Sequence, residues 1–261
     1  SHDHLDYHKS FKDYLKSKLL LFQNLLKKKS NVITDINIPQ YKTIKNIAEK
    51  KHHKIFTIGS KKSYLELIKH EYIDDRQLFK IKYKNKVYDI TVNLIGKIQI
   101  KNVLMAMIAA EKSNIKFEKI IKSIHKIKPI NGRIEKIGYL KNSSKVILDY
   151  AHTPEALSNC LQNLEQQYKN RKIAIVFGCG GDRDKSKRSK MGKIANKFCD
   201  KIYLTDDNPR FENPKKIRLS IKKSINKSKL YEIANREKAI SNAIQNLNSG
   251  EILLVAGKGH E

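Results

Sequence analysis

Polar clusters with residue types suited to ligand binding follow short apolar runs in the second half of the chain. The clusters are Asp149 to His152, Gly178 to Asp184, Asp206 to Arg210, a shorter Asn235-Arg236, and Gly257 to Glu261. The apolar runs before them lack strict alternation, which is typical of strands buried on both faces of a parallel sheet. The carboxyl ends of such strands meet at one edge, where open α/β sheets bind ligands. The sequence therefore predicts one site at this edge.

The Asp206 to Arg210 turn combines two carboxylates, an amide and a guanidinium. This mixture suits a zwitterionic ligand, because an arginine pairs with a carboxylate through two hydrogen bonds while the acids take an ammonium. An Asp-rich helix cap with its arginine on the surface explains the same residues equally well.

Gly178 to Asp184 is a glycine-rich turn between a predicted strand and a predicted helix. Its backbone amides could hold an anion, with Arg183 adding a charge-assisted hydrogen bond. A tight turn whose glycines need positive φ is the alternative. At the preceding strand end, Asp149 and His152 are suited to ribose or metal-bound water.

His4 and His8 lie four residues apart, which places them on one face of a helix. The pair suits a metal ion or a structural role. No glutamate follows the first histidine, as a zinc protease would need.

Two groups of elements position these residues. In the first half we expect helices over 10–29, 102–112 and 117–127, strands over 32–36 and 55–58, and a hairpin of 79–83 with 87–94. In the second half we expect strands over 146–148, 173–177, 202–204, 230–234 and 252–256, with helices over 154–168, 186–198, 214–225 and 237–247. Thr153 and Asn213, each before a proline, are predicted N-caps. Pro129 to Gly132 breaks the pattern and marks the predicted domain boundary.

The chain of 261 residues has a net charge of +28, which raises the possibility of nucleic-acid binding. The lysines are spread over many segments without an interleaved set of stacking aromatics, so solvated lysine-rich faces are the favoured interpretation. Cys160, Cys179 and Cys199 have no disulfide-like spacing, which favours a reducing cytosol. We expect neither a membrane span nor a signal peptide.

Seven ordered motifs carry a resemblance to the Mur ligase family, and within it to the branch that adds diaminopimelate. They are Ser1 to His8, Asn102 in its apolar helix, Gly132-Arg133, Asp149 to Leu157, Gly178 to Asp184, Asp207 to Arg210 and Gly257 to Glu261. The resemblance runs from end to end of the chain. It implies an α/β fold, with residues 1–131 as part of a P-loop-type central ATP-binding domain and residues 132–261 as a Rossmann-like, mostly parallel C-terminal domain.

The resemblance also implies an activity. The family activates a substrate carboxylate with ATP as an acyl phosphate, which the incoming amine attacks. Here the substrates would be UDP-N-acetylmuramoyl-L-alanyl-D-glutamate and meso-diaminopimelate, joined in peptidoglycan synthesis by a cytoplasmic monomer that binds ATP and Mg²⁺, and neither nucleic acid nor membrane.

Residue roles follow from the same resemblance. His4 and Lys18, the latter as a carbamate, would hold magnesium, and with Arg133 they form the expected catalytic set. Asn102, Arg133 and Asp149 would contact ATP. The expected diaminopimelate pocket consists of Arg183, Asp207, Asn208, Pro209, Arg210, Gly257 and Glu261.

Departures from the family pattern lead to a further expectation. No G-x-x-x-x-G-K-[ST] loop occurs, and Lys97 and Gln99 stand where the family usually has other residues. We therefore expect a ligase fragment without its P-loop and last helices, inactive alone. The alternatives are a basic nucleic-acid-binding α/β protein and a ligase similar to folylpolyglutamate synthetase.

Overall fold

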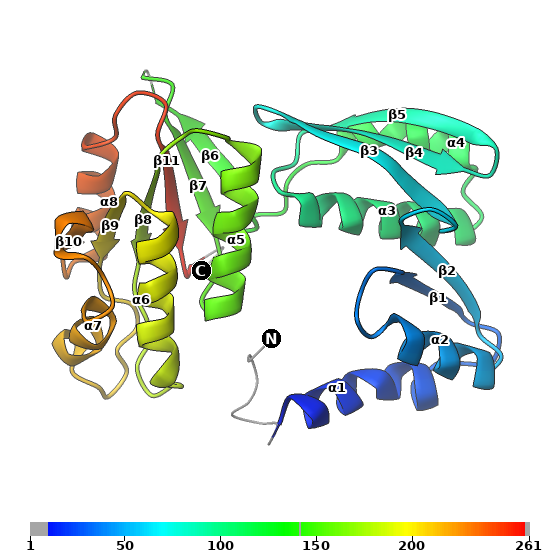
Figure 1. Ribbon diagram of the computed structural model, residues 1–261, viewed down its shortest axis with the longest axis horizontal. Helices are drawn as coiled ribbons and strands as arrows, with labels where there is room; N and C mark the ends of the chain where they lie inside the picture. The colour runs from blue at the N-terminus through cyan, green and yellow to red at the C-terminus, as the bar shows by residue number, and fades with distance from the viewer. Residues whose placement is uncertain (1–9, 141, 259–261) are drawn as a thin grey trace. The chain divides into compact units, whose positions relative to one another are not determined.

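The computed structural model describes residues 10–140 and 142–258. The chain divides into two compact units between Lys128 and Pro129, and each unit has its own sheet (Figure 1). The first unit ends close to residue 131, where we expected the boundary. In the described ranges, no helix has the length and apolar character needed to cross a membrane.

The sheet of the first unit has the order β1-β2-β3-β4-β5. Its strands are β1 (Asn31–Asp35), β2 (Lys54–Gly59), β3 (Leu65–Ile73), β4 (Arg76–Tyr83) and β5 (Lys86–Val92). The first three strands pair in parallel, and β3, β4 and β5 pair antiparallel, which confirms the predicted hairpin. We did not predict β3, because only Leu65 among its residues is buried and its apolar pattern is therefore weak.

The described residues of this unit form four α-helices: α1 (Phe11–Leu20), α2 (Tyr41–Lys50), α3 (Lys97–Lys112) and α4 (Phe117–Ser123). The prediction of one helix over residues 10–29 is wrong beyond Leu20, where a π-helical turn follows and ends at Leu25. We did not predict α2. Helix α3 buries Ile100, Leu104 and Ile108, spaced four residues apart, in the core formed with β4.

The sheet of the second unit has the order β10-β9-β8-β11-β7-β6. Its strands are β6 (Glu135–Tyr139), β7 (Lys145–Asp149), β8 (Ile173–Phe177), β9 (Lys201–Leu204), β10 (Leu230–Glu232) and β11 (Ile252–Ala256). All neighbours pair in parallel except β6 with β7. The five predicted strands are present, whereas the antiparallel edge strand β6 was not predicted.

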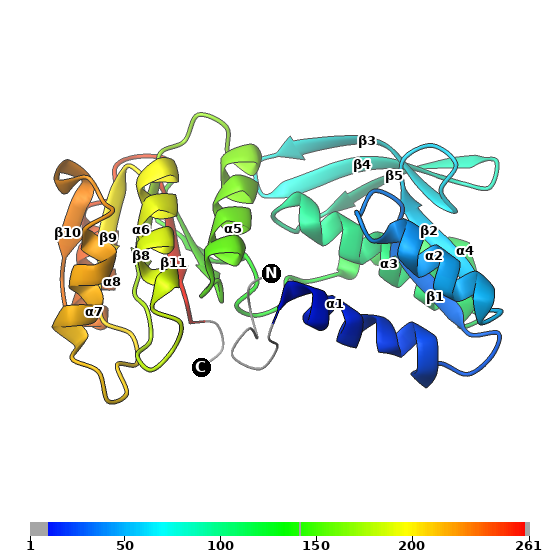
Figure 2. The same cartoon turned by 60° about the horizontal axis from the view of Figure 1, so that its bottom comes forward.

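Helices cover both faces of this second sheet. They are α5 (Pro154–Gln167), α6 (Ser186–Phe198), α7 (Pro214–Lys222) and α8 (Arg236–Gln245). Val146 and Leu253 belong to the core cluster that includes Ala239 and Ala243 of α8. The alternate strand residues Ile147 and Leu254 are also fully buried, so they face the opposite layer, where α5 and α6 lie side by side (Figures 1 and 2). The prediction of a mixed α/β protein is confirmed.

The predicted N-caps of two of these helices are confirmed. The hydroxyl of Thr153 accepts a hydrogen bond from the amide of Ala156, and the side chain of Asn213 accepts from two amides at the start of α7. Both caps fix the point where a polar loop at the sheet edge becomes a helix. The loops that carry the candidate site therefore end at defined positions.

Candidate active site

The carboxyl ends of β7, β8, β9 and β11 lie at one edge of the second sheet. The strand register pairs Ala256 with Asp149, Val255 with Val176, and Phe177 with Leu204. The polar residues that follow each strand are therefore brought to the same edge. In an open α/β sheet this edge is the usual place of ligand binding.

The glycines after β8 are required by the neighbouring loop after β9. A Cβ on Gly178 would lie 2.4 Å from the carbonyl oxygen of Thr205, and a Cβ on Gly181 would lie 1.9 Å from that of Pro209. Neither residue has a positive φ. The explanation by positive φ is therefore wrong for these two glycines, since close approach of backbone to backbone excludes any side chain here.

Two amides of this turn already have partners within the protein. Gly181 donates its N–H to the carbonyl oxygen of Asn208 at 2.9 Å, and Asp182 donates its N–H to Oε1 of Glu212 at 2.7 Å. These two amides do not form a vacant anion cradle, because a protein carbonyl and a protein carboxylate accept their hydrogen bonds.

Arg210 lies at the tip of the loop after β9, in a left-handed backbone conformation with φ of 49°. Its Nη1 donates to the carbonyl oxygen of Gly181 at 2.7 Å, and its backbone N–H donates to Oδ1 of Asn208 at 3.1 Å. Among the described residues no other group accepts from this guanidinium, and the residue as a whole is exposed. The remaining nitrogens can therefore meet a carboxylate from solvent.

Asp207 and Asp206 have different surroundings although they are neighbours. Asp206 forms an ion pair with Arg218 of α7, and Arg218 also contacts Glu232 at 3.0 Å. Asp207 accepts only from the amide of Asn208, at 2.8 Å, among the contacts of the described chain. Of the two carboxylates in this turn, Asp207 is available for a ligand and Asp206 has a structural partner. The helix-cap alternative does not apply to the pair, because Asn213 caps α7.

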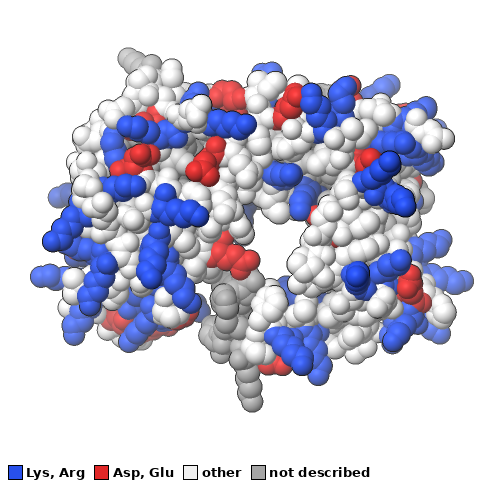
Figure 3. All heavy atoms as spheres, in the orientation of Figure 1, with Lys and Arg blue, Asp and Glu red and all other residues white. Residues whose placement is uncertain are grey.

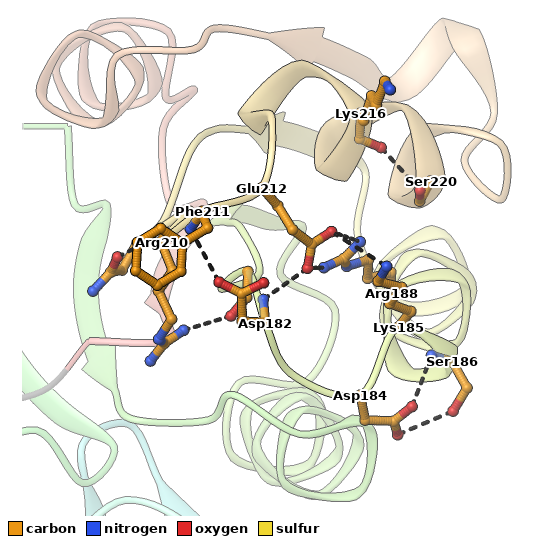
Figure 4. Close-up of polar contacts among 12 residues, drawn as sticks. Asp182, Asp184, Lys185, Ser186, Arg188, Arg210, Phe211, Glu212, Lys216 and Ser220 are labelled. Carbon is orange, nitrogen blue, oxygen red and sulfur yellow. Dashed lines mark hydrogen bonds and ion pairs between the residues drawn. The ribbon is translucent and has the colours of Figure 1, made fainter.

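Glu212 and Arg188 contact the loops of the candidate site, and neither was predicted from the sequence. The two guanidinium Nη atoms of Arg188 donate to the two carboxylate oxygens of Glu212 at 3.0 and 2.8 Å (Figure 4). The side chain of Arg188 is buried in helix α6. Its hydrogen bonds lower the pKa of Glu212 to about 2. The only signal for Glu212 in the sequence is its position two residues after the Asp207 to Arg210 motif, whereas Arg188 is hidden among the lysines of α6.

Asp149 holds the chain segment that enters the second unit. Its Oδ2 accepts from the amide of Ile134 and its Oδ1 from the amide of Ala151, both at 2.8 Å. Burial raises the pKa of Asp149, and the two amides oppose that rise. The guanidinium of Arg133 is exposed and lies 5.3 Å from the ring centroid of Tyr150. Asp149 thus fixes the turn that presents Arg133, and Ile134 keeps a strained positive φ of 48° there.

Gly257 closes the same edge at the end of β11. It has a φ of 95° and donates its N–H to the carbonyl oxygen of Asp149 at 3.0 Å. The guanidinium of Arg236 donates to the carbonyl oxygen of Ala256 at 2.9 Å. Its other Nη atom is buried without a hydrogen-bond partner in the described chain. Arg236 therefore adds a second positive charge near Asp207, at the edge where the Asn235-Arg236 cluster was predicted to lie.

The remaining predicted residues are less constrained. Pro209 contributes its carbonyl oxygen to the turn that ends with the amide of Glu212, at 3.0 Å, and Arg183 is exposed on the loop after β8. In the first unit, Asn102 is exposed on α3 and donates to Oε1 of Gln99 at 3.3 Å. His4 and Glu261 lie outside the described residues.

Lys18 is exposed on α1, and its Nζ lies 5.5 Å from the ring centroid of Tyr14. No three His, Cys, Asp or Glu side chains of the described segments form a group that could hold a metal ion. An unmodified lysine cannot ligate a cation, so the described residues alone do not make a magnesium site.

On the face drawn in Figure 3, positive charge is spread rather than concentrated. Figure 3 shows Lys and Arg side chains over both parts of the visible face, with Asp and Glu among them. This distribution agrees with solvated lysine-rich faces and shows no single basic surface in that view.

Two domain models of known families match the chain. Residues 1–110 match the Mur ligase middle domain, and residues 132–259 match the glutamate ligase domain of Mur ligases. The chain is 40% identical over 262 aligned residues to the UDP-N-acetylmuramoyl-L-alanyl-D-glutamate–2,6-diaminopimelate ligase of Rickettsia typhi, covering all of this chain and 52% of that protein. The protein with this name from Chelativorans sp. is 36% identical, with 99% and 53% covered.

Solved structures show the same architecture. A solved structure of a UDP-N-acetylmuramoyl-L-alanyl-D-glutamate–2,6-diaminopimelate ligase matches with a TM-score of 0.68 at 30% identity, covering 100% of this chain and 54% of the other. A MurF ligase from Thermotoga maritima in complex with ADP matches with a TM-score of 0.74 at 15% identity, over 98% of this chain and 56% of that one. The chain thus spans about half the length of the curated relatives it matches.

Proposed function

This chain belongs to the Mur ligase family, and from that premise we propose that it is part of an ATP-dependent ligase that joins meso-diaminopimelate to UDP-N-acetylmuramoyl-L-alanyl-D-glutamate. The observation that carries this proposal is the 40% identity, along the whole chain, to proteins named for that reaction. The Asp207 to Arg210 loop supports it, because its available charges match an amino acid with an additional carboxylate.

The proposed amino-acid pocket lies along the edge formed by the ends of β8, β9 and β11. Diaminopimelate differs from lysine by a carboxylate at its far end, and the guanidinium of Arg210 has nitrogens available for this anion. We assign the adjacent ammonium to Asp207, whose carboxylate accepts only from the amide of Asn208 among the described residues. We include Arg183, Asn208, Pro209, Gly257 and Glu261 in this pocket by their positions in the family motifs.

The proposed nucleotide contacts are Asn102 of the first unit and Arg133 and Asp149 of the second. Each carboxylate oxygen of Asp149 already accepts from a backbone amide, so its main contribution is to hold the turn that presents Arg133. ATP would supply the phosphoryl group that activates the carboxylate, and Mg²⁺ would screen the approach of two negative charges. We assign the metal to His4 and to Lys18 as its carbamate, and we place this reaction in the cytoplasm with a monomeric enzyme.

The test of amino-acid choice is Arg210→Ala in a chimera. The matching half of the Rickettsia typhi ligase is replaced by this chain, and the rate of ligation is measured with diaminopimelate and with lysine. Loss of a charge-assisted pair typically costs about 2–5 kcal/mol, so the variant should lose most use of diaminopimelate while its KM for ATP changes little. Arg210→Lys should fail as well, because a point charge does not reproduce the fork.

The control is the unsubstituted chimera, which must use diaminopimelate in preference to lysine. If Arg210→Ala retains that preference, the assignment of the pocket is wrong. The nucleic-acid alternative predicts tight binding of an oligonucleotide that weakens steeply with added salt. Binding of diaminopimelate to the chain itself should depend far less on salt. Calorimetric titrations at several salt concentrations therefore distinguish the ligase from the nucleic-acid-binding protein.

A further inference from the structure

The loop after β8 and the loop after β9 are joined by hydrogen bonds that all converge near Arg210. The amide of Gly181 donates to Asn208, Arg210 donates to the carbonyl oxygen of Gly181, and the amide of Phe211 donates to Oδ2 of Asp182 at 3.0 Å. Figure 4 shows Asp182 between Arg210 and Glu212 in this arrangement. The position of the Arg210 guanidinium thus depends on where the β8 loop lies.

Glu212 connects both loops to helix α6. One of its carboxylate oxygens accepts from the amide of Asp182 and from Arg188, and the other accepts from the second Nη atom of Arg188. Glu212 also donates its own amide to the carbonyl oxygen of Pro209 at 3.0 Å. The side chains are 18% exposed for Glu212 and 4% exposed for Arg188. A carboxylate two residues after Arg210 is therefore fixed to a buried cation.

This ion pair is poorly suited to be a stabilising device alone. Removing the charge of Arg188 from water is costly, and apolar side chains of similar volume often serve stability as well or better. The Nε atom of Arg188 is also buried with no hydrogen-bond partner among the described residues, which adds to the cost. What the pair does provide is one defined geometry, because a bidentate pair fixes both planes.

The backbone of Arg210 gives independent support. A non-glycine residue in the left-handed region is strained, and this conformation persists only where the surroundings determine it. The surroundings here are Asn208, Gly181 and the Asp182–Glu212 contact. Without Glu212 the loop after β9 loses its hydrogen bonds to Arg188 of α6. The left-handed backbone conformation of Arg210, which directs its guanidinium outward, then loses its support.

We propose that Arg188 and Glu212 are positioning residues, which hold the Arg210 guanidinium in the geometry that selects a second carboxylate on the incoming amino acid. This inference rests on the proposed function for the identity of the ligand. The positioning itself concerns only this chain. Neither residue touches the ligand in this arrangement, and both act through Arg210 and the two loops.

The first test measures positioning without catalysis. Amide hydrogen exchange is followed in the 261-residue chain and in its Glu212→Gln variant, which keeps the shape of the side chain but not its charge. Exchange at Gly181, Asp182 and Phe211 should become at least about tenfold faster, a factor equivalent to roughly 1.4 kcal/mol, while β8 amides stay protected. Unchanged exchange at these three amides would overturn the inference, whatever the enzyme's substrate.

The second test uses the chimera and separates positioning from general stability. Glu212→Gln and Arg188→Lys should raise the KM for diaminopimelate by about tenfold or more and reduce its preference over lysine, with the KM for ATP within about twofold. Arg188→Lys is the milder variant and serves if Glu212→Gln does not fold. A KM for diaminopimelate that stays within about twofold in both variants contradicts the inference.

The matched control is Glu251→Gln. Glu251 is likewise a carboxylate paired with a cation, Lys201 at 2.8 Å, but it lies at the amino end of β11, away from the site. This variant should lower thermal stability without changing the KM for diaminopimelate. If the unsubstituted chimera does not use diaminopimelate, the proposed function fails, and the exchange experiment alone decides whether Glu212 positions the loops.

Discussion

Gly181→Ala should separate the two loops of the site, and the structure allows the size of the effect to be worked out. The new Cβ would lie 1.9 Å from the carbonyl oxygen and 2.7 Å from the carbonyl carbon of Pro209. An ordinary contact needs at least about 3.2 Å between carbon and oxygen, so the backbones must move apart by roughly 1.3 Å. The neighbour is main chain and cannot rotate away.

This movement breaks the hydrogen bonds that Gly181 makes. The bond from its amide to Asn208 is 2.9 Å long and that from Arg210 to its carbonyl is 2.7 Å long, so neither survives the separation. A neutral hydrogen bond contributes about 0.5–1.5 kcal/mol and one from a charged donor about 1.5–3 kcal/mol. We therefore expect Gly181→Ala to destabilise the second unit by about 2–4 kcal/mol.

The matched control is Gly138→Ala in the edge strand β6. A Cβ on Gly138 would meet no atom within 4 Å, and its φ is not in the left-handed region. The same chemical change should be neutral there, or stabilising by about 0.4–1 kcal/mol, because alanine reduces the conformational freedom of the unfolded chain.

Two measurements check this prediction. Urea unfolding followed by hydrogen exchange and mass spectrometry gives the free energy of unfolding for the second unit separately. The reactivity of Cys179 with a thiol reagent reports on the loop, because this cysteine is buried between Gly178 and Gly180 and burial raises its pKa to about 11. If Gly181→Ala unfolds within about 0.5 kcal/mol of the wild type and Cys179 stays protected, the close-approach argument is refuted.

Three further predictions concern charge, metal and core. Arg188 lowers the pKa of Glu212 from 4.5 to about 2, so the stabilisation from this carboxylate is complete above pH 4.5 and is lost as pH falls towards 2. Hydrogen exchange at the Asp182 amide should become faster in this pH window, and an exchange rate that does not change there contradicts the prediction. Lys18→Ala should inactivate the chimera, and a small carboxylate should partially restore the activity. In the unsubstituted chimera, isotope-labelled bicarbonate should give a carbamate signal from Lys18. Full activity of the variant rules the carbamate out. Leu164→Ala, at a fully buried position of α5, should lower the free energy of unfolding measured in urea by about 2–5 kcal/mol. A loss below about 1 kcal/mol would show that Leu164 contributes little to the core.

The local apolar pattern of the sequence was sufficient to predict an element where that element has a strong apolar or amphipathic signal and is bounded by turn residues. The predicted bounds of β8 and β11 and of helix α6 agree with the structure, because each has a strong apolar or amphipathic signal with clear ends. Strand β6 escaped prediction because it is a half-exposed edge strand interrupted by a bulge between Lys136 and Gly138. Its pairing with β7 comes from tertiary contact and leaves little trace in the apolar pattern.

The order of the strands also follows from sequence only in part. That parallel strands bring their carboxyl ends to one edge is a general property of the α/β arrangement, so the sequence by itself predicted a site at that edge. It also identified Asp207 and Arg210 as the residues with suitable charges. The insertion of β11 between β7 and β8 determines which loops are neighbours, and only the tertiary structure decides it.

The partners of the charged side chains were decided by the tertiary structure as well. Asp206 and Asp207 are adjacent in sequence, yet Asp206 is paired with Arg218 while Asp207 remains available. Arg188 meets Glu212 across 24 residues, and nothing in a helix rich in lysine distinguishes Arg188 from its neighbours before packing buries it. The physical reason is that residue type and spacing limit what a side chain can do, whereas burial and long-range register decide which partner it meets.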